Sequence, residues 1–145
     1  MMPDAIELVI VTPEKQLFRE RVPDVEMPGE NGYLGILPGH APLMTELGIG
    51  ELSYHQAGGK ESTNFAIVRG FAEVLPDRVT ILAETAERAQ EIDLQRAKDA
   101  LARAEKRLAA NDPNIDWDRA NIALQRALIR IQVATKKRSA LVSGS

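Results

Sequence analysis

The chain has 145 residues, of which 44% are hydrophobic and 27% are charged, and its formal net charge is -3. This is enough apolar material for one domain, or for one domain with an appendage. The absence of cysteine excludes disulfides, thiolate nucleophiles and cysteine metal sites, and two histidines are too few for a histidine-based metal centre.

The chain begins MMPDAIELVIVTPE, without the basic residues that open a signal peptide. No apolar run approaches the roughly 18 residues of a membrane-spanning helix. We therefore expect an intracellular protein that reaches a membrane only through a partner.

Residues 6–83 consist of short apolar segments separated by turn residues. Their spacing is typical of an antiparallel sandwich or barrel. HQAGGKES and LPDRV are expected hairpin turns, because glycine supplies positive φ and Pro-Asp initiates turns. GGKES is not a phosphate-binding loop, since it lacks the first glycine at the required spacing and the hydroxyl group after lysine.

The segment PGENGYLGILPGHAPLM, residues 28–44, combines three prolines and four glycines with mostly apolar side chains. A flexible linker would contain serine with the glycine, and a buried strand would not tolerate this much proline. We therefore predict an ordered loop that presents apolar surface to a partner. Within it, His40 fits a turn histidine held by backbone hydrogen bonds.

From residue 91 the apolar period changes from two residues to about 3.6. Asp93 is a candidate N-cap, and Asp116 is a second one after the break at NDPN. The residues predict a helical hairpin with two apolar seams: Leu94, Ala97, Leu101, Ala104 and Leu108, then Ala120, Leu124, Ala127, Ile131 and Ala134. An alanine-rich contact should close tightly but hold weakly, because a buried methyl group contributes less than a leucine side chain.

Charge changes at the same place along the chain. Residues 1–90 hold 7 basic and 14 acidic side chains, whereas residues 91–145 hold 11 basic and 7 acidic ones. No acidic residue follows Asp118, so the end of the chain carries a run of unopposed basic residues. Such a run is either a solvated face or a surface for an acidic partner.

Four arginines of the predicted hairpin could meet. Arg96 and Arg103 share a face of the first helix, and Arg126 and Arg130 share a face of the second. Antiparallel folding would let these faces converge on a phosphate-like anion. The alternative is an Asp99–Arg103 ion pair, with the other arginines solvated.

Groups that could perform chemistry do not cluster in the sequence. It contains no nucleophile-elbow motif, no zincin motif and no grouping of carboxylates with histidine. The net acidity and the 4% aromatic content argue against nucleic-acid binding. We therefore expect neither catalytic residues nor a metal site.

The segments GENGYLGILPGHAPLM and FAIVRGFAEVLPDRVTILAETAERAQEID, followed by the alanine-rich hairpin, resemble the epsilon subunit of bacterial F-type ATP synthases over essentially the whole chain. The resemblance implies a non-catalytic rotor subunit in the central stalk of a proton-translocating synthase, peripheral to the cytoplasmic face of the inner membrane. It implies an α+β fold, with a ten-stranded sandwich over residues 1–88 that binds the gamma subunit and the c-ring, and a regulatory two-helix hairpin over residues 89–145.

In this family the loop matching residues 30–40 lies at the contact with gamma and the c-ring. The resemblance therefore implies these rotor-contact residues: Glu30, Asn31, Gly32, Tyr33, Leu34, Ile36, Leu37 and His40. Glycine and proline would set the shape of the loop before docking, which avoids the cost of ordering it on contact.

The resemblance also implies regulation by the hairpin. Folded against the sandwich, the hairpin of this family permits ATP hydrolysis. Extended along gamma into the alpha/beta head, it blocks hydrolysis through a basic face, which here comprises Arg119, Arg126, Arg130, Lys136 and Lys137.

Some family members bind ATP at the folded hairpin through an I/L-D-x-x-R-A motif and further arginines. IDLQRA supplies this motif, so the resemblance implies an ATP site formed by Glu87, Ile92, Asp93, Arg96, Ala97, Arg103, Arg126 and Arg130. ATP would be a regulatory ligand, and no cofactor would be required. The alternative function is a stand-alone sandwich that senses nucleotide or binds another small ligand, with residues 28–44 as a pocket wall.

Overall fold

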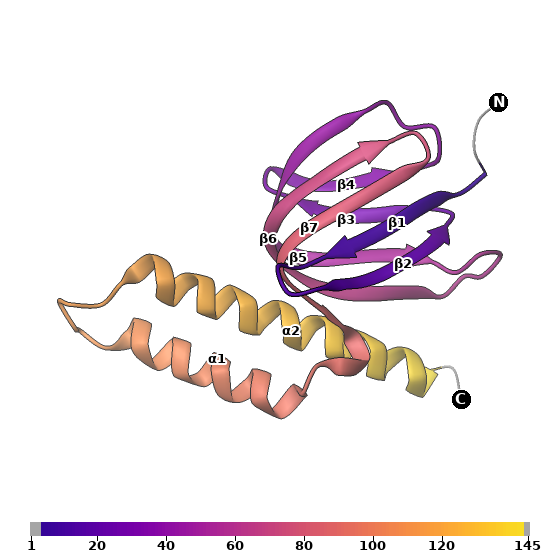
Figure 1. The fold of residues 1–145 in the computed structure, drawn as a ribbon. Coiled ribbons are helices and arrows are strands. Elements are labelled where there is room, and N and C mark those ends of the chain that lie inside the picture. The colour runs from indigo at the N-terminus through magenta and orange to yellow at the C-terminus, as the bar shows by residue number, and fades with distance from the viewer. Residues whose placement is uncertain (1–3, 144–145) are drawn as a thin grey trace. The chain divides into compact units, whose positions relative to one another are not determined.

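The computed structural model describes the backbone of residues 4–143 and the side chains of residues 4–136. The chain divides into two compact units at the junction of Arg88 and Ala89. The first unit is built from strands and the second from helices (Figure 1). This confirms the predicted α+β class.

The first unit is a seven-stranded sheet with the order β2-β1-β7-β6-β5-β3-β4. Its strands are β1 (Ile6–Val11), β2 (Gln16–Val22), β3 (Val25–Gly29), β4 (Gly32–Ile36), β5 (Leu43–His55), β6 (Ser62–Leu75) and β7 (Arg78–Arg88). HQAGGKES and LPDRV form the β5–β6 and β6–β7 turns, as predicted.

Two features of the sheet differ from the expected ten-stranded antiparallel sandwich. The β1–β7 pair is parallel, with Leu8 opposite Val79, while the other pairs are antiparallel. A parallel pair needs a long crossover, which the chain from β2 to β6 provides. The described residues form seven strands because β5 and β6, with 13 and 14 residues, are each a single long strand.

The sheet folds over one hydrophobic core. Phe18 of β2 lies 5.2 Å from Tyr54 of β5 and 5.4 Å from Phe65 of β6, measured between ring centroids. Strands β2 and β5 are separated by three strands in the sheet order, so these contacts join opposite parts of a curled sheet (Figure 1). Period-two alternation supplies the rest of the core, such as Leu8 and Ile10 of β1.

Residues 28–44 are not the single ordered loop predicted from the sequence. Residues 28–36 complete β3 and form β4, an edge strand, and only residues 37–42 are a connection. Pro28 is tolerated in β3 because the pairing of β3 with β5 is irregular between Glu26 and Gly29. The missing amide hydrogen of proline therefore falls where the ladder is already interrupted.

The second unit is an antiparallel hairpin of α1 (Leu94–Ala109) and α2 (Trp117–Ser143), preceded by a short 3-10 turn, η1 (Ala89–Glu91) (Figure 1). The Asp93 carboxylate accepts a hydrogen bond from the Arg96 amide at 3.1 Å and caps α1. Asp116 accepts one from the Arg119 amide at 3.0 Å at the start of α2. Both predicted N-caps are confirmed.

The contact between the helices is rich in alanine, as predicted. The five seam alanines are buried, whereas the seam leucines are only partly buried. Helix α2 also buries Ile129 and Val133, which the predicted seam does not include. By helical geometry these two side chains lie on the side of α2 opposite its seam alanines, so they do not enlarge the contact between the two helices.

Candidate functional site

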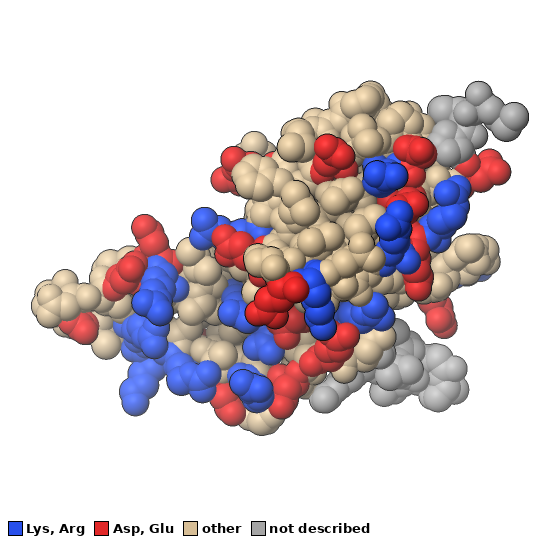
Figure 2. All heavy atoms as spheres, viewed as in Figure 1, with Lys and Arg blue, Asp and Glu red and all other residues tan. Residues whose placement is uncertain are grey.

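A groove of about 410 Å³ lies between α1 and α2. Its alanines and Ile122 form a floor of short or apolar side chains, and five arginines line it: Arg103, Arg107, Arg119, Arg126 and Arg130. The lining contains no acidic residue. Figure 2 shows the basic side chains gathered along the hairpin. Short side chains leave depth between the helices, so an anion in the groove could reach guanidinium groups from both.

The arginines follow the same spacing on both helices. Residues 96, 103 and 107 of α1 are separated by seven and four positions, and so are residues 119, 126 and 130 of α2. At 3.6 residues per turn, these steps keep each set on one side of its helix. Arg96 is exposed and shares the side of Arg103, but it is not part of the groove lining.

Four of the groove arginines have no counter-ion within the part of the chain whose side chains the structure describes. Among the described residues, Arg103, Arg107, Arg119 and Arg126 form no side-chain hydrogen bond or ion pair. The alternative Asp99–Arg103 pair is not formed among the described residues, and the Asp99 carboxylate accepts a hydrogen bond from the Gln95 amide group at 3.0 Å. The charge of the groove is therefore available to an external anion.

The predicted ATP residues are divided between different places. Arg103, Arg126 and Arg130 come together in the groove. Ile92 and Asp93 line a separate hollow of about 500 Å³ at the start of α1. Ala97 is fully buried in the seam, and Arg96 is exposed one turn into α1. Glu87 lies near the end of β7 in the sandwich unit.

The sequence analysis did not assign Arg107 to the ATP site and assigned Arg119 only to the basic face. Arg107 lies one helical turn after Arg103, so the i,i+4 spacing was the available signal. For Arg119 the signal was its separation of seven residues from Arg126. The expected basic face is also not uniform, because Lys136 lies on a different side of α2 from the arginine row by helical geometry. The side chain of Lys137 lies outside the described residues.

The β3–β4 hairpin holds most of the expected rotor-contact residues. Tyr33 and Leu37 are 53% and 65% exposed, whereas Ile36 is buried in the core. Leu34 packs against that core, and Glu30, Asn31 and Gly32 form the turn into β4.

The Tyr33 side chain crosses from β4 to β5. Its hydroxyl accepts a hydrogen bond from the Glu51 amide at 3.0 Å. Gly50 gives it room, because a Cβ there would lie 2.7 Å from that hydroxyl. The Tyr33 hydroxyl thus fixes the hairpin to β5, while about half of the residue stays exposed to solvent.

Two carboxyl groups meet beside the hairpin turn. The Glu30 amide donates to the Glu46 carbonyl at 2.9 Å, which holds the turn against β5. A hydrogen bond with the Glu30 side chain and the charge of Glu30 raise the pKa of the Glu46 carboxyl. The state in which one of the two carboxyl groups is protonated is therefore favoured over the state in which both are ionised.

A second apolar surface lies on the outer face of the sheet, and we name Met44, Phe71 and Leu82 the strand-face patch. Phe71 of β6 pairs directly with Leu82 of β7, and both are about half exposed, at 50% and 49%. Met44 of β5 is 66% exposed and lies diagonally across from Phe71. The sequence analysis missed this patch, although the period-two alternation with buried Ala72 and Ile81 would have placed both side chains outside.

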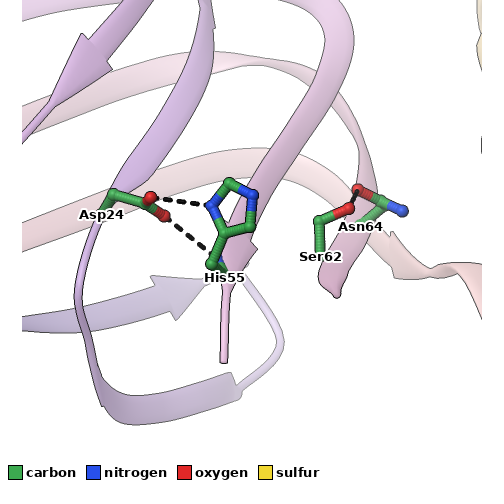
Figure 3. A network of polar contacts seen from close by, with 4 residues as sticks. All are labelled: Asp24, His55, Ser62 and Asn64. Atoms are coloured by element: carbon green, nitrogen blue, oxygen red, sulfur yellow. Dashed lines mark hydrogen bonds and ion pairs between the residues drawn. The ribbon is translucent and has the colours of Figure 1, made fainter. Parts of the chain in front are cut away.

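The two histidines have structural roles. His40 Nδ1 donates to the Ala41 carbonyl at 2.6 Å, as the turn interpretation predicts. Figure 3 shows the Asp24 carboxylate bound to His55 twice, to the ring Nδ1 at 2.7 Å and to the backbone amide at 2.9 Å. This contact ties the β2–β3 connection to the end of β5. Nearby, the Ser62 hydroxyl donates to Asn64 at 3.3 Å.

Metal sites and membrane-spanning helices are both absent from the described part of the chain, in which side chains are described for residues 4–136. No group of three or more histidine, aspartate or glutamate side chains there could hold a metal ion. Neither described helix is both long and apolar enough to cross a membrane.

The chain is similar to known proteins over nearly its whole length. Residues 5–89 match the family model described as ATP synthase, Delta/Epsilon chain, beta-sandwich domain, and residues 90–135 match the model for the long alpha-helix domain of the same chain. An ATP synthase epsilon chain of Solibacter usitatus is 48% identical, with 94% of this chain and all of the relative covered. One from Koribacter versatilis is 56% identical over 77% of this chain and 78% of the relative.

A solved structure gives the same match in three dimensions. It is a chain in the Euglena gracilis mitochondrial ATP synthase structure containing OSCP, F1 and the c-ring. The two chains superpose with a TM-score of 0.80 at 26% identity, covering 93% of this chain and 84% of the other.

Proposed function

The chain belongs to the ATP synthase delta/epsilon chain family, and on that premise we propose that it couples the catalytic head of a bacterial proton-translocating synthase to the c-ring. It is a non-catalytic subunit of the central stalk. In this role the sandwich unit binds gamma and the c-ring, and the hairpin regulates ATP hydrolysis. The chain would lie at the cytoplasmic face of the inner membrane, held there through the complex.

The observation that carries the docking proposal is the exposed apolar surface of the sandwich unit. Large side chains are exposed at Tyr33 of β4, at Leu37 directly after β4, and on the strand-face patch. A soluble protein leaves such surface exposed at a cost, and burial against a partner recovers about 25 cal/mol per Å². The hairpin is held by hydrogen bonds at Tyr33 and Glu30, so little ordering would be needed on docking.

Copurification with gamma tests this proposal, with Phe71→Ser as the variant. Burying a half-exposed phenylalanine contributes about 1.4 kcal/mol, so we expect gamma to bind about tenfold more weakly. Leu128→Ser is the matched control, because Leu128 is 49% exposed but lies on α2. If the two variants bind gamma equally well, the strand-face patch is not the docking surface. If the wild-type chain does not bind gamma, the rotor assignment fails.

The regulatory part of the proposal rests on the groove and on the weak seam. ATP that binds only the folded hairpin would stabilise it by RT ln(1 + [L]/Kd), about 2.7 kcal/mol at a hundredfold excess over Kd. An alanine seam buries little apolar surface and stabilises the folded hairpin only weakly, so a contribution of this size would matter. High ATP would therefore keep the hairpin folded. When ATP is scarce, the hairpin would extend, and its basic residues would contact the alpha/beta head.

The stand-alone nucleotide sensor remains the second candidate, because the arginine groove would serve a free sensor equally well. Only the rotor proposal predicts a stable complex with gamma. The gamma experiment above therefore separates the two functions, while ATP binding alone does not.

A further inference from the structure

The arginine groove is longer than the phosphate chain of a single nucleotide requires. Arg119 and Arg130 are eleven residues apart on α2, which corresponds to about 16 Å at 1.5 Å per residue. On α1, Arg103 and Arg107 line the opposite wall. A triphosphate would occupy only part of this length.

The part of the groove beyond the ATP motif contains Arg107 and Arg119. Both have exposed side chains, and among the described residues neither has a hydrogen-bond or ion-pair partner for its guanidinium group. Asp116 accepts a hydrogen bond from the backbone amide of Arg119 and not from its guanidinium group. The two guanidinium groups therefore make no contact that would stabilise the fold, whereas binding of an anion would explain their position in the groove.

We propose that the groove binds linear inorganic polyphosphate along its length, with Arg107 and Arg119 holding the part of the chain that extends past the ATP site. Every phosphate unit carries negative charge, and arginine forks bind phosphate oxygens in pairs. The alanine floor lets the ligand lie between the two rows. This inference rests on the same groove as the proposed ATP regulation and adds a second ligand to it.

One observation favours inorganic polyphosphate over single-stranded nucleic acid. The groove lining contains no aromatic side chain on which bases could stack. A ligand with closely spaced charges and no bases fits a narrow groove of this kind better.

Calorimetry on the full-length chain tests the proposal with linear polyphosphate, inorganic tripolyphosphate, ATP and a single-stranded oligonucleotide. We expect polyphosphate to bind more tightly than tripolyphosphate. Each hydrogen bond to a charged group contributes about tenfold or more in affinity. The Arg107→Gln/Arg119→Gln variant should therefore bind polyphosphate about a hundredfold more weakly, if each arginine supplies one such bond. Its affinity for ATP should fall much less, because the proposed ATP site uses only Arg103, Arg126 and Arg130 of this groove.

The matched control is Lys15→Gln/Lys106→Gln, which removes the same charge from two exposed lysines outside the groove. Circular dichroism should show unchanged helix content in both variants, because both keep the Asp116 carboxylate that caps α2 and the Arg119 backbone amide that donates to it. Equal loss of polyphosphate binding in both variants, equal affinity for tripolyphosphate, or equal affinity for the oligonucleotide would overturn the proposal. Failure of wild-type ATP binding alone would overturn the ATP regulation and leave the polyphosphate result to stand by itself.

Discussion

Two glycines of the sandwich unit occupy places where a side chain has no room. A Cβ on Gly50 would lie 2.5 Å from Cβ of Pro28. A Cβ on Gly70 would overlap the carbonyl oxygen of Leu82, and the φ of Gly70 is +154°. These glycines let β6 approach β7 and let Tyr33 cross to β5. Single residues thus shape the surface that we propose for docking.

Gly70→Ala should lower the free energy of unfolding of the full chain by about 2 kcal/mol or more, because alanine meets both backbone overlap and an unfavourable φ. Gly35→Ala is the matched control, since nothing lies within 4 Å of a Cβ at that position of β4. Chemical denaturation measures both variants. An equal effect of the two substitutions would show that strand propensity, and not the close approach at Gly70, sets the cost.

The Glu30–Glu46 pair gives a prediction about pH. The pKa of Glu46 is raised by the hydrogen bond and the charge of Glu30, so the folded chain holds this proton more strongly than the unfolded chain. Its contribution to stability is fully present below the unfolded pKa and is lost as pH rises through the folded pKa. Carboxyl NMR titration should show a lower pKa for Glu46 in Glu30→Gln, because the charged partner is gone. An unchanged titration would mean that Glu30 does not cause the shift.

At the scale of elements, the ATP motif and the start of α1 are the same residues. Asp93 caps the helix, Ile92 is 7% exposed, and Ala97 is buried in the seam. The motif would therefore be needed for the hairpin to fold even if no ATP were bound. A loss of ATP binding on mutation is ambiguous unless folding is measured separately.

Asp93→Ser and Asp93→Ala separate the two roles. Serine is a good N-cap, whereas alanine removes the cap and should destabilise the hairpin by about 1 kcal/mol. If the carboxylate also binds ATP, calorimetry should show weaker ATP binding for Asp93→Ser while helix content is kept. Full ATP affinity in Asp93→Ser would show that Asp93 acts only as a cap. Hydrogen exchange on α1 provides the stability measurement.

Elements with strong periodicity were predictable, and those set by long-range pairing were not. The helical seams and both N-caps follow from residues close in sequence. The parallel β1–β7 pair and the place of residues 28–36 in the sheet depend on distant strands. Proline and glycine indicated a loop there because a local pattern cannot show that the ladder is irregular opposite Pro28.

Part of the groove could be predicted, because helical spacing is a local signal that the sequence shows. Arg103, Arg126 and Arg130 were found through helical spacing and the family motif, and the structure brings them together. Arg107 satisfies the same spacing but lies outside the motif. The strand-face patch needed the register of β5, β6 and β7, which the sequence alone does not give.

At the scale of the whole molecule, the sandwich unit has a hydrophobic core of its own. The core cluster of the described residues draws only on residues 6–86, and the division falls after Arg88. The helices pack on each other through their own seam. Docking and regulation can therefore be assigned to different units, as the proposed function requires.

A chain that ends at Arg88 tests this assignment. Because its core cluster is complete without residues 89–145, we expect the truncated chain to fold cooperatively and to bind gamma with the affinity of the full chain. A synthase assembled with it should hydrolyse ATP without inhibition, and ATP should neither bind the truncated chain nor change its stability. Steady-state hydrolysis with full-length and truncated chains gives the comparison. Retained inhibition would place the brake in the sandwich unit, and loss of gamma binding by a folded truncated chain would place part of the docking surface on the helices.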